Sequence, residues 1–385
     1  MQYCLKCITP ISRPRVVFDK NGVCNACNWD EKKKKIDWKE RKEYLEDILG
    51  CACSGQSSGV IEGKEYPKER HDYCEDRHNI IVPVSGGKDS SYVAWKMEHE
   101  FGMNPLCITF SPPIQTKLGR QNLENFRNSG FDLIEIRPNP EVYRRLCKRM
   151  FVEQARCKFP FVIGIATAIA KEALVRNIPL VIYGEEGETE YGGSDKFENN
   201  FFLNDEYLKI YHEGHDMSSY LDEFTEQELS WWLLPSIEEM KKLSITWWSK
   251  YELWDDKLHA DLAIEKCGLQ TETSPSIGTF TDYAQLDDVL QDLHMYECFI
   301  KYGTGRTTAD CNLAIKAGRM TRKEAVEYVN KHEGTFPIEY LGKYLDFFGM
   351  TSSEFMNVIA KHANMDILDY AGGSNKPYTL KEPVK

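Results

Sequence analysis

The segment 80–92, IIVPVSGGKDSSY, constrains the fold of this chain more than any other stretch. Residues 80–84 are a short apolar, β-branched run that predicts a buried strand, and residues 91–101 have the apolar spacing of a helix. A glycine-rich turn joins the two. A strand, a glycine turn and a helix in this order direct free backbone N–H groups at an anion. The segment therefore predicts an α/β fold with a phosphate site at the turn.

The side chains of this turn suit a nucleotide with its metal ion. We assign six residues to ATP and pyrophosphate binding: Ser85, Gly86, Gly87, Lys88, Asp89 and Ser90. Lys88 can neutralise phosphate charge, and Asp89 can hold Mg²⁺. The turn is not a Walker A loop, because Val82 and Asp89 stand where that pattern needs glycine and Ser or Thr. SGGKDS after a strand instead resembles the pyrophosphate loop of the N-type ATP pyrophosphatases, which cleave ATP between the α and β phosphates; the alternative is an ordinary glycine-rich turn.

Composition narrows the class of protein. A chain of 385 residues predicts two or three domains, and 42% hydrophobic residues are enough for a sizeable core. No apolar run of 18 residues and no signal-peptide core is found, so we expect no membrane span and a cytoplasmic location. The net charge of −12 favours a small substrate over a nucleic acid.

Two Cys-x2-Cys pairs open the chain, and sixteen residues lie between them. Cys4, Cys7, Cys24 and Cys27 match the four thiolates of a zinc ribbon, with Asn21-Gly22 as a hairpin turn between the pairs. Such a shell leaves no ligand position open, so the Zn²⁺ would be structural. An iron–sulfur cluster and four unrelated buried cysteines are the alternatives. Cys51, Cys53 and Cys74 lack the pairing of a metal site and are interpreted as incidental thiols.

Strand and helix patterns alternate from residue 80 onward. The expected strands are residues 80–84, 106–110, 133–136, 180–183 and 245–251, and the expected helices are residues 91–101, 119–128, 141–154 and 161–176. This order predicts a doubly wound parallel sheet with its ligands at the carboxyl ends of the strands. The expected domains are a zinc ribbon (1–37), a helix and linker (38–76), an ATP-binding α/β domain (77–268) and a helical C-terminal region (269–385).

A glycine-rich acidic segment, GEEGETEYGGSD at 184–195, follows the strand expected at 180–183. Its acids can coordinate Mg²⁺ or accept hydrogen bonds from sugar hydroxyls; the alternative is a plain polar loop. Arg156 and Lys158 could add a cationic patch to the same rim, and Arg306 lies in a glycine turn that could present it to a ligand. The residues assigned to substrate or Mg²⁺ are Glu185, Glu188, Tyr191, Asp195 and Arg306. For the tryptophan pairs 231–232 and 247–248, a place in the core is favoured over stacking on a sugar.

With SGGKDS, YGEEGETEYGGSD and GTGRTTAD…IKAGRMTRKEA in place, the chain resembles the N-acetyl sugar amidotransferases of bacterial surface-polysaccharide (LPS O-antigen) and flagellin-glycan (pseudaminic acid) pathways. The resemblance implies a fold of the adenine nucleotide alpha hydrolase type, with ATP, Mg²⁺ and structural Zn²⁺ as cofactors. It implies conversion of a sugar N-acetyl group to an acetamidino group, with release of AMP and pyrophosphate. Lys88, Asp89 and Glu185 would be the catalytic residues, and the acidic rim, with Glu186 and Glu190, would suit the cationic product.

Ammonia for this reaction would come from elsewhere. The chain has neither an N-terminal nucleophile at Gln2 nor a G-x-C-x-G elbow, so we expect it not to hydrolyse glutamine. The resemblance implies glutaminase and cyclase-like partner subunits. A tRNA-modifying enzyme of the same ATP class, of the thiolase type, is the competing interpretation, and a non-catalytic zinc-ribbon adaptor would leave SGGKDS unexplained.

Overall fold

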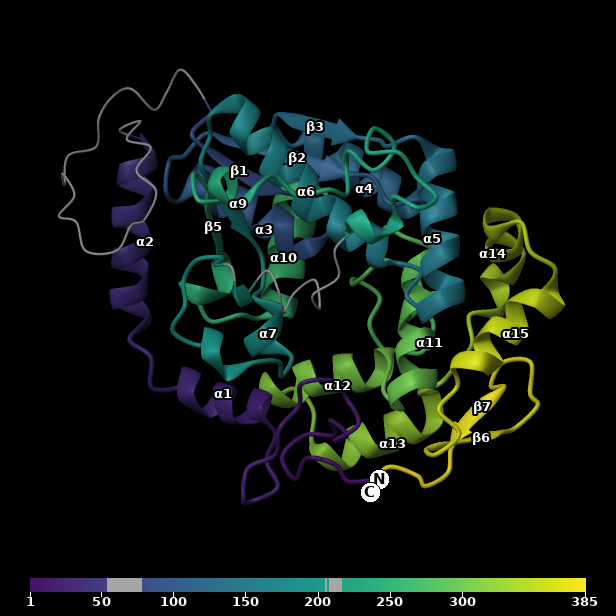
Figure 1. The fold of residues 1–385 in the computed structure, drawn as a ribbon. Helices are drawn as coiled ribbons and strands as arrows, with labels where there is room; N and C mark the ends of the chain where they lie inside the picture. Colours follow the sequence, from purple (N-terminus) through teal and green to yellow (C-terminus); the bar gives the residue numbers. More distant parts are fainter. Residues whose placement is uncertain (54–77, 205, 208–216) are drawn as a thin grey trace.

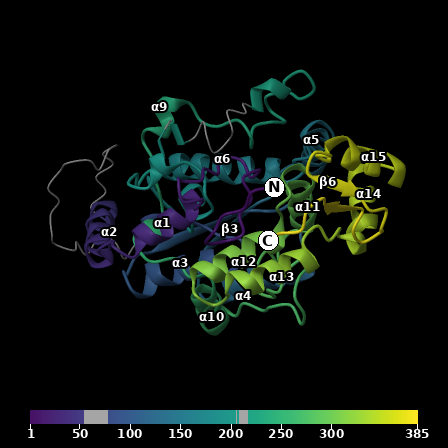
Figure 2. The ribbon, with the colours of Figure 1, turned by 90° about the horizontal axis from the view of Figure 1, so that it is seen from below.

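Five parallel strands form one sheet, in the order β3-β2-β1-β4-β5, and helices cover both of its faces (Figures 1 and 2). The computed structural model describes residues 1–53, 78–204, 206–207 and 217–385. The strands are β1 Ile80–Pro83, β2 Pro105–Phe110, β3 Leu133–Ile136, β4 Leu180–Tyr183 and β5 Ser244–Trp247. A separate antiparallel pair, β6 Leu368–Tyr370 and β7 Tyr378–Leu380, lies near the C-terminus.

The helices follow the chain in this order: α1 Asn25–Lys33, α2 Trp38–Cys53, α3 Lys88–His99, α4 Lys117–Asn128, α5 Pro140–Gln154, α6 Phe159–Arg176, α7 Gly187–Glu190, α9 Ile237–Met240, α10 Asp256–Cys267, α11 Leu290–Tyr302, α12 Arg306–Lys316, α13 Arg322–His332, α14 Leu341–Phe348 and α15 Ser352–His362. Short 3₁₀ turns are η2 Asp195–Phe197, η3 Met217–Tyr220, η4 Trp248–Lys250 and η5 Ile338–Tyr340. None of the described helices is both long and apolar enough to cross a membrane.

Alternate residues of the central strands enter two separate cores. Ile81 and Val181 face one core, with side chains of α5, α6, α11, α14 and α15, and Ile80, Val82 and Ile182 face the other, with α2, α3, α4 and α10. This alternation is the two-residue period of a strand. Figure 2 shows α6 and α3 on opposite sides of the sheet. The sheet is therefore buried on both faces, which explains why its strands read as continuous apolar runs.

The order in which strands are added to the sheet reverses at β1. Strands β2 and β3 follow β1 on one side, whereas β4 and β5 extend the sheet from the other side of β1. A crevice forms where the strand order reverses, at the carboxyl ends of the two central strands. The turn after β1 and the acidic segment after β4 meet at this point.

The C-terminal region joins the two ends of the chain. Helices α12 and α13 lie beside the N-terminal loops, and β6 and β7 lie close by (Figure 1). Arg322 of α13 donates to the carbonyls of Cys4 and Cys7, and the amino group of Met1 lies 2.9 Å from Glu382. Thr321 and Glu324 form a capping box at the start of α13.

The structure confirms the doubly wound parallel sheet and corrects its details. The strand expected over residues 245–251 ends at Trp247, because the chain turns into η4. The tryptophans of both pairs pack in the core as favoured, and Trp232 donates to the carbonyl of Pro160 at 2.8 Å. Cys74 and the side chains of Cys51 and Cys53 lie outside the described residues.

Candidate active site

A cavity of about 370 Å³ opens at the carboxyl ends of β1 and β4. One wall is the turn from Ser85 to Ser90, and a second is formed by Gly184, Glu185 and Tyr191. The carboxyl end of β2 contributes Ile108 and Phe110, which lie near Phe161 and Ile165 of α6. The remaining wall comes from the segment 281–287, all of which except Asp282 lines the cavity, together with Asp310 and Leu313. The cavity thus joins the sheet to the C-terminal region.

Backbone geometry in the turn leaves donors free for an anion. Gly86 has φ +77°, and a Cβ there would lie 2.7 Å from backbone atoms of Leu123, so only glycine fits. Gly87 precedes α3 without a side-chain cap, which leaves the N–H groups of the first turn unsatisfied. Ser85 N donates to Ser90 Oγ and Gly87 N to Ser85 Oγ, both at 3.3 Å. This arrangement suits a phosphate group at the N-terminus of α3.

Lys88 and Asp89 form an ion pair at the start of α3, and His259 of α10 contacts the Asp89 carboxylate. His259 Nδ1 lies 3.0 Å from Asp89 Oδ1, and its fully buried ring stacks on Tyr92 and meets the Trp254 ring edge-on. Burial alone would raise the pKa of Asp89, but the Lys88 ammonium and the bond from His259 hold it below its ordinary value. A glycine-rich turn predicts solvent-facing side chains, but those of Lys88 and Asp89 are only 12% and 23% exposed.

Glu185 and Tyr191 line the same cavity close to this pair, since a Cβ on the neighbouring Gly184 would lie 3.5 Å from the Asp89 Cβ. Tyr191 Oη donates to Glu185 Oε1 at 3.2 Å. Burial raises the pKa of Glu185 above its ordinary value and the Asp89 carboxylate adds to this, while Lys88 acts in the opposite direction. Among the described carboxylates of the acidic segment, Glu185 is the one that lines the cavity.

The neighbouring acids turn away from the cavity, which corrects the expected acidic rim. Glu186 caps α7 and accepts from Tyr207 at 3.0 Å. Glu188 pairs with Arg15 at 2.7 Å and is not among the residues that line the cavity. Glu190 is buried against Lys33 at 2.7 Å and Trp29 at 3.2 Å. Buried carboxylates need such partners. Asp195 begins η2, and its side chain lies outside the described residues.

The cationic residues expected at the rim are also engaged elsewhere. Arg306 is 4% exposed and does not line the cavity; its guanidinium binds Asp310, Gln285 and the carbonyl of Ala284. Lys158 is buried beside Asp288 at 3.4 Å, and Arg156 lies over the ring of Phe159. The glycine turn therefore orients Arg306 inward, behind the cavity wall.

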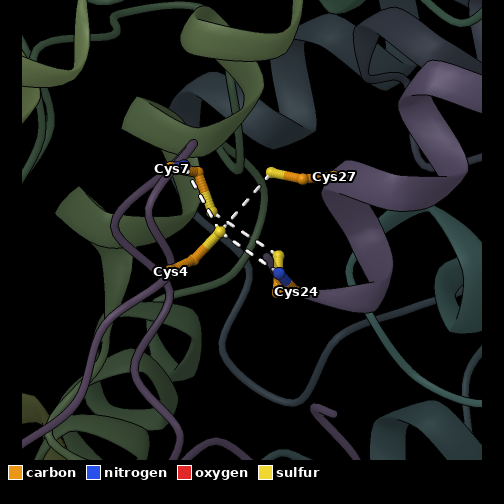
Figure 3. Close-up of side chains that lie close together, drawn as sticks. All are labelled: Cys4, Cys7, Cys24 and Cys27. Atoms are coloured by element: carbon orange, nitrogen blue, oxygen red, sulfur yellow. Dashed lines mark hydrogen bonds between the residues drawn. The ribbon is translucent and has the colours of Figure 1, made fainter. Parts of the chain in front are cut away.

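The four cysteines of the N-terminal pairs converge on one point (Figure 3). All four are buried, and their sulfurs lie within 4.8 Å of one another. Cys7 Sγ lies 3.7 Å from Cys24 Sγ, and Cys4 Sγ lies 3.9 Å from Cys27 Sγ. A tetrahedral ion with metal–sulfur bonds of about 2.3 Å has sulfur–sulfur edges of about 3.8 Å. The residues thus fit a single four-thiolate metal ion, which would tie the two N-terminal loops together.

His259 contacts the candidate site although no sequence pattern marks it, and its replacement tests whether it positions Asp89. His259→Phe keeps an aromatic ring but removes the donor to Asp89. We expect kcat/KM for ATP to fall about 10- to 100-fold, the weight of a hydrogen bond to a charged group. His259→Asn, whose amide nitrogen can replace Nδ1, should recover part of this loss. Equal activity of both variants and the wild type would exclude the positioning role.

Sheet order, phosphate-type turn and four-cysteine cluster together define a doubly wound α/β protein with a candidate nucleotide site at the turn and a candidate metal site at its N-terminal loops. Residues 277–379 match the model of the LPS biosynthesis protein WbpG-like C-terminal domain. The match supports the resemblance to the sugar amidotransferases, because the GTGR and GRMTR motifs lie inside it.

Two solved structures are similar over long stretches. The U34-tRNA thiolase NcsA from Methanococcus maripaludis, with its [4Fe-4S] cluster, aligns at 11% identity and a TM-score of 0.31, covering 94% of this chain and 90% of that one. The predicted subunit of a tRNA methyltransferase from Methanocaldococcus jannaschii aligns at 14% identity and a TM-score of 0.28, covering 59% of this chain and 88% of that one. These scores are low, and neither alignment bears on function. No curated protein matches the chain.

Proposed function

We propose that this chain is an ATP-dependent amidotransferase that converts a sugar N-acetyl group to an acetamidino group and releases AMP and pyrophosphate. One observation carries the proposal. Lys88 and Asp89 of the phosphate-type turn share a cavity with residues 281–287 and Asp310, which belong to the LPS-biosynthesis domain. A nucleotide site and a surface-polysaccharide domain meeting in one cavity support a sugar-modifying enzyme that uses ATP.

The chemistry requires activation of a poor electrophile. The amide oxygen attacks the α phosphate of ATP and pyrophosphate leaves, so the oxygen becomes part of a good leaving group, AMP. Ammonia then adds to the carbon of the imidate, which still carries the amide N–H; one ammonia proton passes to a base, the bond from carbon to the AMP oxygen breaks, and the amidinium cation remains. Magnesium, when bound by Asp89 beside the phosphates, supplies positive charge that offsets the charge on the departing pyrophosphate. Positioning of the two substrates supplies much of the rate.

The proposed roles follow from the chemistry of each side chain. Lys88 stabilises negative charge on the β and γ phosphates, and the N–H groups at the start of α3 bind the same oxygens. Asp89, held by His259, stays ionised beside Lys88. Glu185, whose pKa is raised, can accept the proton released as ammonia adds and can then remain beside the cationic product.

An assay of ATP turnover tests the reaction class. Purified protein with ATP, ammonium and a panel of free and nucleotide-linked N-acetyl sugars should produce AMP and pyrophosphate in a sugar-dependent manner. Formation of ADP would show that the class is wrong. AMP formation that depends on bulk tRNA and a sulfur donor would favour the thiolase interpretation, against which the net charge of −12 counts.

The nitrogen source gives a separate prediction. Turnover of the purified chain should proceed with ammonium salt but not with glutamine alone, and it should rise with pH as more ammonia is unprotonated. Adding a glutaminase and cyclase-like pair from the same pathway should restore the use of glutamine through a physical complex. Efficient glutamine-dependent turnover by this chain alone would refute the need for a partner.

A further inference from the structure

Residues 281–287, here called the strap, form the polar wall of the cavity that the proposed function leaves without a role. The strap runs from the neighbourhood of α12 to the N-terminus of α4. Thr281 Oγ1 donates to Asp310 at one end, at 3.0 Å, and Thr116 N donates to the carbonyl of Asp287 at the other, also at 3.0 Å. Tyr283 Oη donates to Asp256 of α10 at 3.0 Å. The strap is therefore held at both ends and in the middle.

Close packing fixes the strap against α4. A Cβ on Gly119 would lie 2.4 Å from the Cα of Asp287, so the backbone approaches where only glycine leaves room. In the middle of the strap Gln285 has φ +57°, which is left-handed for a residue other than glycine and costs about 1–3 kcal/mol. A strained residue persists when its surroundings hold it, and strain of this kind gathers at ligand sites.

The Gln285 carboxamide is oriented by two donors. Its Oε1 accepts from Gln291 Nε2 at 2.9 Å and from the guanidinium of Arg306. With the oxygen fixed in this way, the amino group of the carboxamide is directed elsewhere. Gln285 is an exposed residue of the cavity wall, so this amino group is a donor that a ligand can reach.

Asp310 supplies the complementary acceptor. Its Oδ2 accepts from Arg306 Nε at 2.9 Å, from Thr281 and from Thr279. No hydrogen bond joins its Oδ1 to any residue in the described part of the chain. One guanidinium, that of Arg306, thus binds Gln285 Oε1 and Asp310 Oδ2. This fixes the positions of the Gln285 amino group, a donor, and of Asp310 Oδ1, an acceptor. A planar guanidinium fixes its partners in a rigid fork, which a lysine in its place would not do.

This pair suits a polyol better than a phosphate. A sugar hydroxyl can donate to a carboxylate while a neighbouring oxygen accepts from a carboxamide. The carboxylates of Asp287 and Asp310 would repel phosphate groups, which have Lys88 on the other wall. The apolar side chains of Ile108, Phe110 and Phe161 suit the adenine ring. The polar groups of the strap are then available to bind the second substrate, the N-acetyl sugar.

We propose that Gln285 and Asp310, positioned by Arg306, form the subsite that binds the hydroxyl-bearing ring of the acceptor sugar. This inference rests on the proposed function and adds to it the side chains that select the sugar. Arg306 is a positioning residue in this scheme, whereas Gln285 and Asp310 touch the substrate.

The test is a comparison of Michaelis constants. Gln285→Ala should raise KM for the N-acetyl sugar about 3- to 10-fold, the weight of one neutral hydrogen bond, with KM for ATP within twofold of wild type. Gln121→Ala, an exposed glutamine on α4, is the matched control and should change neither constant. Arg306→Lys keeps the positive charge but loses the planar guanidinium that binds Gln285 and Asp310 together, so it should raise the KM for sugar as well. Thermal unfolding of each variant checks that the fold is intact.

The outcomes separate the two proposals. An unchanged KM for sugar in Gln285→Ala, with wild-type protein active on sugars, would overturn the subsite and leave the amidotransferase standing. A rise in the KM for ATP alone would assign the strap to the nucleotide and would also overturn the subsite. Failure of the wild type to make AMP with any N-acetyl sugar would remove the proposed function first and the subsite with it.

Discussion

Replacement of Lys88 with methionine is expected to lower AMP and pyrophosphate formation by about 10²- to 10³-fold, the usual effect of removing one preorganised charge from a transition state. Methionine keeps the length of the side chain and removes its charge. Lys88 lies in the first turn of α3, beside free N–H groups, and no other described lysine lines the cavity to replace it. Rates of pyrophosphate release with saturating sugar and ammonium measure the loss.

Stability has to be measured in the same experiment. Lys88 pairs with Asp89 in a largely buried position, so the variant leaves that carboxylate with the bond from His259 alone. A destabilisation of about 1–3 kcal/mol is expected, the cost of removing one partner of a buried polar pair. Lys117→Met, at an exposed lysine in the first turn of α4, is the matched control and should change neither rate nor stability. A Lys88→Met protein that folds and forms AMP at the wild-type rate would show that the turn is not the ATP site.

The features that could be predicted from the sequence are those encoded by neighbours in the chain. The strand at 80–83 and its glycine turn are a continuous signal, and the four strands from β1 to β4 were found within one residue at each end. The four cysteines of the cluster carry their spacing in the sequence, and they do converge. Local pattern decides these elements because their burial and turn geometry involve few distant residues.

The residues that could not be predicted depend on contacts between distant parts of the chain. Five acids in the segment 184–195 look alike in sequence, but only the fold shows that Glu188 meets Arg15 and that Glu190 meets Lys33. His259 stands 170 residues from Asp89, within a helix of ordinary composition. No local signal marks such partners, because long-range pairing is decided by tertiary packing. Arg306 was misplaced for the same reason: its glycine turn is visible in the sequence, whereas the carboxamide and carboxylate that hold it are not.

Helix α1 connects the four-cysteine cluster to the cavity. Cys24 and Cys27 lie at its N-terminal end, and Trp29 and Lys33 farther along it bind Glu190. Arg15 holds Glu188, and Arg13 donates to the carbonyl of Gly192 at 3.2 Å. These bonds fix both sides of Tyr191, whose hydroxyl orients Glu185 in the cavity. The bound metal would therefore support the site through a chain of described contacts.

Loss of this metal is expected to have the second large effect. Cys4→Ser with Cys24→Ser should abolish binding of about one equivalent of zinc, measured by elemental analysis of purified protein, since structural zinc contributes folding free energy directly. We expect AMP formation to fall with it. Cys298→Ser, at a partly exposed cysteine outside the cluster, is the matched control and should keep the metal. Iron with visible absorbance in the wild type would contradict the assignment to zinc.

A third variant distinguishes an effect of the metal transmitted to the cavity through α1 from a loss of activity caused by unfolding. Lys33→Met leaves all four cysteines in place but removes the partner of the buried Glu190. If α1 transmits the effect of the metal, this variant should keep its zinc, yet turn over ATP more slowly and with weaker sugar binding, because Tyr191 and Glu185 are no longer held in position. Full activity with full metal content would mean that the cluster stabilises the N-terminal loops alone. The two results are distinguished by one buried ion pair, because without Lys33 the Glu190 carboxylate keeps the bond from Trp29 but loses its 2.7 Å ammonium partner.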